Sequence, residues 1–445
     1  MSRCSAVVER DYFFALADDV TVQAKPGEIA LLNFRGETSD FIRYSRTRIR
    51  QAGRVRQARL RLTLVSNQRQ ASAAVDLSGD QKADCSFMRS KIVELRAQHA
   101  MLPEDPYVHL ASDLSDSERA DSIQLPDANE ATTCIADAFR DLDMTGIWAC
   151  GENCAGFANT SGQRNWHAVG SFNFDCSIHS GTNSVKQSIA GQRLDLNALI
   201  GSAEDARKTL SLLSRSPRRL KPGRYRAYLA PDAMVEILGL LSWGGFGLRS
   251  YRTGRSPLMR LVDGDVQLDP RVSVFEDVAS GFAPAFTAEG FIRPDRVPLV
   301  DNGCFANCLV DARSAREFDQ SVNASVEAPL SLQMAPGALA DEDVFAALDT
   351  GIYISNLWYL NFSDRNACRI TGMTRFACLW VEDGVPRGPL EPMRFDDTLY
   401  GLLGERLLDF SKTRRLSLDP DTYEGRSFCS ALLPGALVEE LNLAL

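Results

Sequence analysis

The chain has 445 residues, 44% of them hydrophobic and 24% charged, with a formal net charge of −9. The chain is longer than one hydrophobic core usually accommodates, which predicts two domains. Its composition excludes a disordered or fibrous protein, and its negative net charge argues against nucleic acid as a partner. No apolar run approaches the roughly 18 residues of a membrane span, no secretory signal opens the chain, and eleven scattered cysteines suit free thiols, so we expect a cytoplasmic protein without membrane association.

The amino-terminal part mixes strand and helix patterns. Segment 28–76 predicts strands, and its stretch ARLRLTLV alternates polar and apolar residues as a half-buried strand does. An amphipathic helix is predicted from about Asp80, because its apolar residues recur on one face, and a second helix is predicted over 128–142. This mixture indicates an α+β domain.

The residue pattern changes beyond residue 145. Short apolar pieces separated by Gly, Asn and Ser predict an antiparallel meander. A weakened capping box predicts a helix that begins at Ser202 and ends near Ser214. The stretch GRYRAYLA then predicts a strand, and Pro231 suits the first position of the apolar helix that follows.

The last part of the chain predicts strands, turns and one helix. The Asp-Gly dipeptides at 263–264 and 383–384 are typical of hairpin turns. Apolar residues alternate from Ile352 onward, which indicates a strand with one buried face, and 376–381 is apolar on both faces like a central strand. An aspartate at 396–397 could cap a following leucine-rich helix.

Residues 351–397 also carry an ordered string of short motifs. In chain order these are Trp358-Tyr359-Leu360-Asn361, Asp364-Arg365, Thr371-Gly372-Met373-Thr374-Arg375, Glu382-Asp383-Gly384 and Met393-Arg394-Phe395-Asp396. The strand pattern alone indicates an ordinary hairpin in a packed sheet. The order of the motifs resembles the carboxy-terminal signature of the TldD/TldE (PmbA) family of zinc-dependent peptidases. Further upstream, Asn159-Thr160-Ser161-Gly162 is more weakly similar to that family's N-S-x-G motif.

This resemblance implies an α+β fold of two domains. We expect an amino-terminal α/β sandwich-like domain over residues 1–220 and a mainly antiparallel β carboxy-terminal domain over 221–445. The boundary is expected within 145–225, where the composition changes.

The family's catalytic subunit carries an H-E-x-x-x-H helix whose histidines bind zinc and whose glutamate is the general base. The matching helix here starts at Pro231, and its stretch ILGLLSWGGF at 237–246 contains no His, Asp or Glu. The chain's four histidines (His99, His109, His167 and His179) form no such motif. The resemblance therefore implies a TldE-like subunit that binds no zinc and has no catalytic residue of its own. Its expected partner is a TldD-like catalytic chain that holds the zinc, or a second copy of itself.

The cysteines offer another metal hypothesis. Cys150 and Cys154 share their spacing with Cys304 and Cys308, and four thiolates could form a closed zinc site. Unrelated buried thiols explain the same residues. Cys429 lies where the family's catalytic chain supplies a cysteine ligand, and without the histidines we interpret it as structural.

Two arginine-rich segments, at 43–61 and 215–226, leave three interpretations open. They could be faces that are solvated or paired with acidic residues, contacts for a peptide or partner protein, or contacts for nucleic-acid phosphates. No G-x-S-x-G elbow or phosphate-binding loop accompanies them.

The expected function is that of a TldE/PmbA-like subunit of a heterodimeric zinc metallopeptidase acting on unfolded peptides. An extended peptide would bind by strand addition, because main-chain hydrogen bonds accept any sequence. The residues expected to contact it are Trp358, Asn361, Arg365, Thr374 and Arg375, which could equally be braces of the sheet. The alternative is a non-enzymatic regulator of the modulator-of-DNA-gyrase type.

Overall fold

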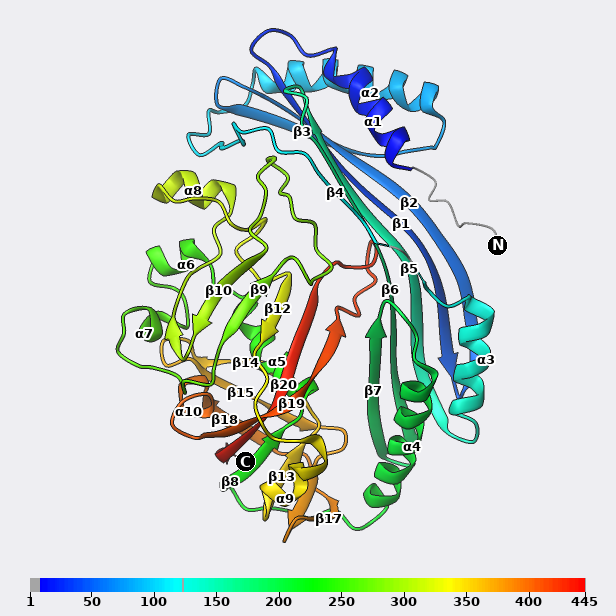
Figure 1. Ribbon diagram of the computed structural model, residues 1–445, viewed down its shortest axis with the longest axis vertical. Helices are drawn as coiled ribbons and strands as arrows, with labels where there is room; N and C mark the ends of the chain where they lie inside the picture. The colour runs from blue at the N-terminus through cyan, green and yellow to red at the C-terminus, as the bar shows by residue number, and fades with distance from the viewer. Residues whose placement is uncertain (1–8, 122–123, 445) are drawn as a thin grey trace.

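The computed structural model describes residues 9–121 and 124–444, and these form two halves, each built on one sheet (Figure 1). The first half uses strands up to Gly191, and the second sheet begins at Gly223. No helix in the described ranges is both long and apolar enough to cross a membrane. The α+β fold expected from the sequence is confirmed, whereas the domain boundary within 145–225 stays a prediction.

The amino-terminal sheet has the order β3-β2-β1-β5-β6-β4, with β7 also beside β6, among the described residues. Its strands are β1 (Ile29–Ser45), β2 (Arg48–Ser66), β3 (Arg69–Asp76), β4 (Ser117–Ala120), β5 (Asp143–Asn159), β6 (Arg164–Ser180) and β7 (Asn183–Gly191). All pairs are antiparallel except β4 with β6. The strands predicted in 28–76 and the meander predicted beyond residue 145 are therefore confirmed.

Four helices cover one face of this sheet (Figure 1). They are α1 (Arg10–Thr21), α2 (Gln81–His99), α3 (Ala128–Ala138) and α4 (Leu196–Leu213). Helices α1 and α2 pack near one end, where Phe34 and Trp166 are buried, and α3 and α4 pack near the other, around Trp148 and Phe172. The predicted start of α2 is confirmed, because the Asp80 carboxylate accepts the first free backbone N–H groups of the helix.

The opposite face of the sheet packs against the second half. Val169 and Phe157 share a buried cluster with Phe282 and Phe428 from beyond residue 220. The side-chain period of two along a strand explains this division, because alternate residues point to opposite faces. Both faces of the sheet are therefore covered over much of its area, whereas residues 48–57 of β2 are exposed on both faces.

The second sheet branches around one long strand, β20. Its strands within the described ranges are β8 (Gly223–Leu229), β9 (Val274–Asp277), β10 (Arg296–Asp301), β11 (Cys304–Phe305), β12 (Ser331–Met334), β13 (Gly351–Ile354), β14 (Asn356–Asp364), β15 (Arg369–Arg375), β16 (Leu379–Glu382), β17 (Val385–Pro389), β18 (Arg394–Thr398), β19 (Leu407–Leu418) and β20 (Ser430–Leu443). One path runs β11-β10-β9-β12-β20-β8-β13-β16-β17, and β18-β15-β14 and β19 branch from β20. The pairing is mainly antiparallel, as predicted, with β12–β20 and β8–β13 parallel.

Short helices connect these strands. They are α5 (Pro231–Gly239), α6 (Leu248–Arg252), α7 (Met259–Val262), α8 (Ala312–Phe318), α9 (Val344–Leu348) and α10 (Leu399–Leu402), with single 3₁₀ turns at Leu240–Ser242 and Asp341–Asp343. The apolar helix predicted from Pro231 is confirmed as α5, with Pro231 in its first turn.

Several predicted elements differ from the structure. The helix predicted over 128–142 ends at Ala138 as α3. Helix α4 begins at Leu196, because the Asp195 carboxylate accepts the Asn197 N–H and caps the helix before Ser202 is reached. The Asp-Gly pair at 263–264 ends α7 instead of turning a hairpin, whereas the pair at 383–384 does join β16 and β17.

The expected helix after 396–397 is also different. Both aspartates lie in β18, the cap of α10 is Thr398, and the helix ends at Leu402. Leu407 opens strand β19, so the leucine spacing that predicted a longer helix spans two elements.

Candidate functional site

Helix α5 lies in the part of the fold where the resemblance predicts catalytic chemistry. It packs on β20, β19 and β14. Its buried face consists of Ala233, Met234, Ile237 and Leu238. The apolar spacing that predicted this helix thus supplies its core contacts, and the remaining side chains decide what chemistry it can support.

Two carboxylates on α5 belong to a charge cluster between the halves. Asp232 Oδ2 lies 2.8 Å from Arg415 of β19, and across the interface Lys186 Nζ of β7 lies 3.3 Å from Asp175 Oδ2 of β6. Burial raises the pKa of the Asp175 carboxyl, and Lys186 opposes that rise. Burial among the surrounding protein also raises the pKa of Glu236, although part of its surface reaches solvent. Asp232 and Asp175 are thus neutralised in ion pairs, whereas Glu236 is exposed and has no ion-pair partner among the described residues.

These residues do not fit a zinc ion. Helix α5 carries no His or Cys. Within residues 9–121 and 124–444, no three His, Cys, Asp or Glu side chains gather closely enough to hold a metal. His167 Nε2 bonds to the Phe282 carbonyl at 2.8 Å, and His99 Nε2 bonds to backbone carbonyls at the end of β2, so both serve the fold.

The cysteine pairs do not form a four-thiolate site either. Cys150 and Cys154 are buried in separate clusters of the first half, Cys308 lies in the core of the second half, and Cys304 is exposed. Every cysteine among the described residues is a free thiol, and burial raises the pKa of Cys429. A buried, protonated thiol is inert, which agrees with a packing role.

The five residues expected to bind peptide lie on the β14–β15 pair. Trp358 is 54% exposed, and the Arg375 guanidinium lies 4.7 Å from the centre of its ring. Asn361 is next to a register shift in β14, where its side chain accepts the Phe362 N–H. The structure brings Trp358 and Arg375 together, and their role in binding stays a prediction.

The other two residues make structural contacts. The Thr374 hydroxyl accepts the Met393 N–H at 2.9 Å and is buried. Arg365 donates to the carbonyls of Arg255 and Trp243, which fixes the β14–β15 turn against the two loops that flank α6. Both contacts suit the alternative interpretation of sheet braces.

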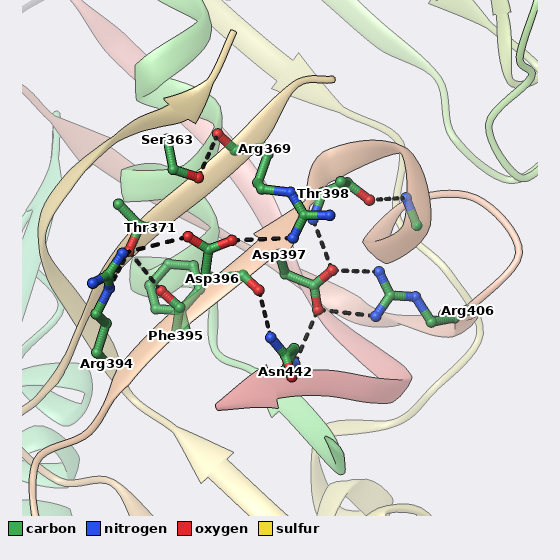
Figure 2. A network of polar contacts seen from close by, with 11 residues as sticks. Ser363, Arg369, Thr371, Arg394, Phe395, Asp396, Asp397, Thr398, Arg406 and Asn442 are labelled. Atoms are coloured by element: carbon green, nitrogen blue, oxygen red, sulfur yellow. Dashed lines mark hydrogen bonds and ion pairs between the residues drawn. The ribbon is translucent and has the colours of Figure 1, made fainter. Parts of the chain in front are cut away.

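Figure 2 shows that the last motif of the signature is a polar brace. The Asp397 carboxylate receives two N–H groups of Arg406, at 2.9 and 2.6 Å, and the Asn442 N–H at 2.9 Å. Asp396 lies 3.1 Å from Arg369, and Arg394 Nε donates to the Thr371 hydroxyl at 2.9 Å. These contacts tie β18 to β15, β20 and the loop before β19.

Sequence reasoning missed the charge cluster on the interface. Asp232 and Glu236 stand four residues apart on an otherwise apolar helix, a spacing that places them on one face. That signal was available, but the Asp232 partner Arg415 comes from a distant strand, as does Lys186, which pairs with Asp175 and whose charge acts on Glu236. No local pattern predicts these neighbours.

The arginine-rich segments are largely solvated and paired. The arginines of 43–61 are exposed, and those at 54 and 59 form ion pairs with Asp40 and Asp76. In 215–226, Arg224 pairs with Glu440, and Arg218 lies 4.3 Å from the Trp380 ring centre. The interpretation as solvated or paired faces therefore accounts for these contacts.

Comparison with known proteins connects these observations to a family. A family model described as the PmbA/TldA metallopeptidase C-terminal domain matches residues 222–445, just over half of the chain. Comparison with curated protein sequences gives no match.

Solved structures share the whole fold. A candidate modulator of a DNA gyrase from Thermotoga maritima is similar with a TM-score of 0.74 and 13% identity, over 97% of this chain and 100% of that one. TldE from Thermococcus kodakarensis is similar with a TM-score of 0.73 and 15% identity, over 98% and 100%. A candidate modulator of DNA gyrase from Bacteroides thetaiotaomicron gives 0.70 and 15%, over 98% of each chain.

At these identities the structural likenesses establish the fold alone, and the family rests on the match to the carboxy-terminal half. That half contains the signature strands β14, β15 and β18 and helix α5. The chain belongs to the PmbA/TldD metallopeptidase family.

Proposed function

We propose that this chain is the TldE-like, non-catalytic subunit of a heterodimeric zinc metallopeptidase that degrades or trims unfolded peptides. One observation carries the proposal: the chain has the family's carboxy-terminal domain but no H-E-x-x-x-H anywhere in its sequence. In the helix expected to carry that motif, Asp232 is engaged with Arg415 and no side chain is a histidine or cysteine. A TldD-like partner would supply the zinc and the general base.

The peptide would bind in an extended form along the second sheet. Strand β14 pairs only with β15 among the described strands, so its other edge can offer backbone groups to a further strand. Trp358 of β14 is exposed with the Arg375 guanidinium over its ring, and we expect both to contact side chains of the peptide. Free thiols throughout the described residues support the cytoplasmic location that forms part of this proposal.

The first test compares the chain alone with the chain co-purified with a TldD-like protein that contains H-E-x-x-x-H. We expect substoichiometric zinc in the isolated chain, one zinc per heterodimer, and hydrolysis of an unfolded peptide by the heterodimer alone. Replacing both histidines of the partner should abolish zinc and hydrolysis together. One tightly held zinc in the isolated chain would overturn the proposal.

The alternative is a non-enzymatic regulator of the kind named in two of the similar structures. The same experiment separates the two functions. A stable homodimer that never recruits a zinc-bearing chain, and that changes the supercoiling rate of purified DNA gyrase, would favour the regulator.

A further inference from the structure

A polar cavity of about 310 Å³ lies between the amino-terminal sheet and the loop that joins β19 to β20. In Figure 1 this loop reaches across to the sheet beside β5 and β6. The floor of the cavity is formed by Gln57, Glu37 and Asn153, which are neighbours across β2, β1 and β5. It lies on the face of the sheet that meets the second half, away from α5.

The loop is fixed to this floor by its backbone. The Arg426 N–H donates to Glu37 Oε2 at 3.1 Å, and Asn153 Nδ2 donates to the Arg426 carbonyl at 3.2 Å. Gly425 permits this approach, because its φ is +148° and an added Cβ would lie 2.8 Å from the side-chain nitrogen of Gln57. The cavity is thus a built feature held by named contacts from both halves.

Two buried oxygens in this floor lack a donor. Glu37 is 5% exposed and Asn153 is 4% exposed, yet Glu37 Oε1 and Asn153 Oδ1 have no hydrogen-bond partner among the described residues. Leaving a buried acceptor unsatisfied costs about 1–3 kcal/mol, and more when it is charged. The two residues are direct cross-strand partners, so one ligand can reach both oxygens.

The charge of the lining favours a cation. The lining contains four carboxylates that form no ion pair with a described residue: Glu37, Asp419, Asp421 and Glu424. They outnumber the two arginines of the lining that also form none, Arg35 and Arg426. The Arg426 guanidinium is directed away, to the Ser171 hydroxyl and the Gly151 carbonyl. A metal ion does not fit, since these carboxylates do not gather as a set of three ligands.

We propose that this cavity binds an alkylguanidinium group. A guanidinium is planar, weakly hydrated and rich in N–H donors, so it can bridge the two orphaned oxygens and stack on aromatic rings. Tyr423 supplies an exposed ring in the lining, whereas the Phe428 ring already faces the Arg35 guanidinium at 5.1 Å. The group could belong to a free small molecule or to an arginine side chain of a peptide, and binding does not depend on the partner subunit.

Isothermal titration of the full chain tests this site with three probes: agmatine, acetyl-Gly-Arg-Gly-amide and the matched peptide with citrulline. We expect the citrulline peptide to bind at least about tenfold more weakly than the arginine peptide, because it lacks the charge. Agmatine binding alone would identify a free small molecule, and binding of the arginine peptide would identify a side chain; either result supports the site.

Matched variants locate the binding. Glu37→Gln keeps the shape of the side chain and should weaken binding about tenfold or more, whereas Glu317→Gln removes an exposed carboxylate on α8 and should change nothing. If Glu37→Gln lowers the melting temperature strongly, the surface pair Asp421→Asn and Glu424→Gln replaces it, and binding should fall about two- to fivefold in low salt. The proposal is overturned if neither agmatine nor the arginine peptide binds, if the arginine peptide binds but the citrulline peptide binds equally well, if binding is unchanged in these variants, or if it requires an added divalent metal.

Discussion

The carboxylate of Asp397 is the most enclosed anion of the signature block, and Arg406 is its cationic partner (Figure 2). Their side chains are only 7% and 13% exposed. Replacing Arg406 by Met should lower the free energy of unfolding by about 3–5 kcal/mol, because the buried carboxylate would lose its counter-charge. Urea denaturation followed by circular dichroism measures this loss.

The exposed neighbouring pair provides the control. Arg369 is 44% exposed beside Asp396, so Arg369→Met should cost less than about 1 kcal/mol. Equal losses in the two variants would contradict the assignment of Asp397 and Arg406 as the buried brace.

His167 makes the stability of the protein depend on pH. It is 1% exposed, and burial lowers its pKa from 6.5 to about 4. Arg119 and Arg293 lower the pKa further, while the Phe282 carbonyl and Asp121 oppose them. Between pH 6.5 and 4, His167 binds a proton in the unfolded chain but not in the folded chain. The free energy of unfolding therefore falls by about 3 kcal/mol as the pH drops from 6.5 to 4.

The variant His167→Gln isolates that contribution. Glutamine can still donate to the Phe282 carbonyl but does not titrate. The difference in unfolding free energy between the two proteins, measured from pH 7 to 4, should shift by about 3 kcal/mol in favour of the variant as the pH falls. A difference independent of pH would show that His167 has the same pKa in the folded and unfolded chains.

For single residues, the sequence motifs identified positions that make specific contacts, but they did not reveal what those positions contact. The motif string containing Asp396 and Arg365 was visible, but strand pairing decides whether such residues meet a ligand or each other. The Asp396 carboxylate pairs with Arg369, and the Arg365 guanidinium donates to backbone carbonyls. Glu37 and Asn153 were missed altogether, because residues more than a hundred positions apart become neighbours only through the register of β1 and β5.

Helix α2 illustrates what a local signal can specify. Asp80 accepts the N–H groups of Lys82 and Ala83 at 3.0 and 3.1 Å. Asp80→Ala should therefore lower the free energy of unfolding by about 1 kcal/mol, while Asp80→Asn, which keeps an acceptor oxygen, should cost less than half of that. Thermal or urea unfolding distinguishes them, and indistinguishable variants would mean that the cap contributes nothing.

Two elements were predicted wrongly for different physical reasons. Ser202 carries a reasonable cap sequence, but Asp195 offers a stronger one further upstream and buries Leu199 as well. Similarly, the leucines after residue 397 fit a helical period, but Leu407 pairs in β19 instead. A stronger local cap decided the first case and tertiary pairing the second, whereas the long alternating strands of the first sheet were predicted because burial of one face is itself a local pattern.

The arrangement of the two halves could not be derived from the sequence, because it rests on contacts between segments far apart in the chain. Phe157 is fully buried at this junction with Val169, Phe282 and Phe428. Since the same cluster draws side chains from both halves, we infer that the halves unfold together. Phe157→Ala should lower the free energy of unfolding by about 3–5 kcal/mol, through lost burial and the cavity left behind.

The cooperativity can be read from two probes of the variant. Near-ultraviolet circular dichroism follows aromatic packing, and far-ultraviolet circular dichroism follows the strands; both should shift to lower urea by the same amount and remain coincident. Tyr423→Ala is the matched control, because this ring is 84% exposed and its loss should change stability by less than about 0.5 kcal/mol. Separate transitions in the Phe157 variant would mean that each half is stable alone and that the junction, including the guanidinium cavity beside it, can open without unfolding the rest.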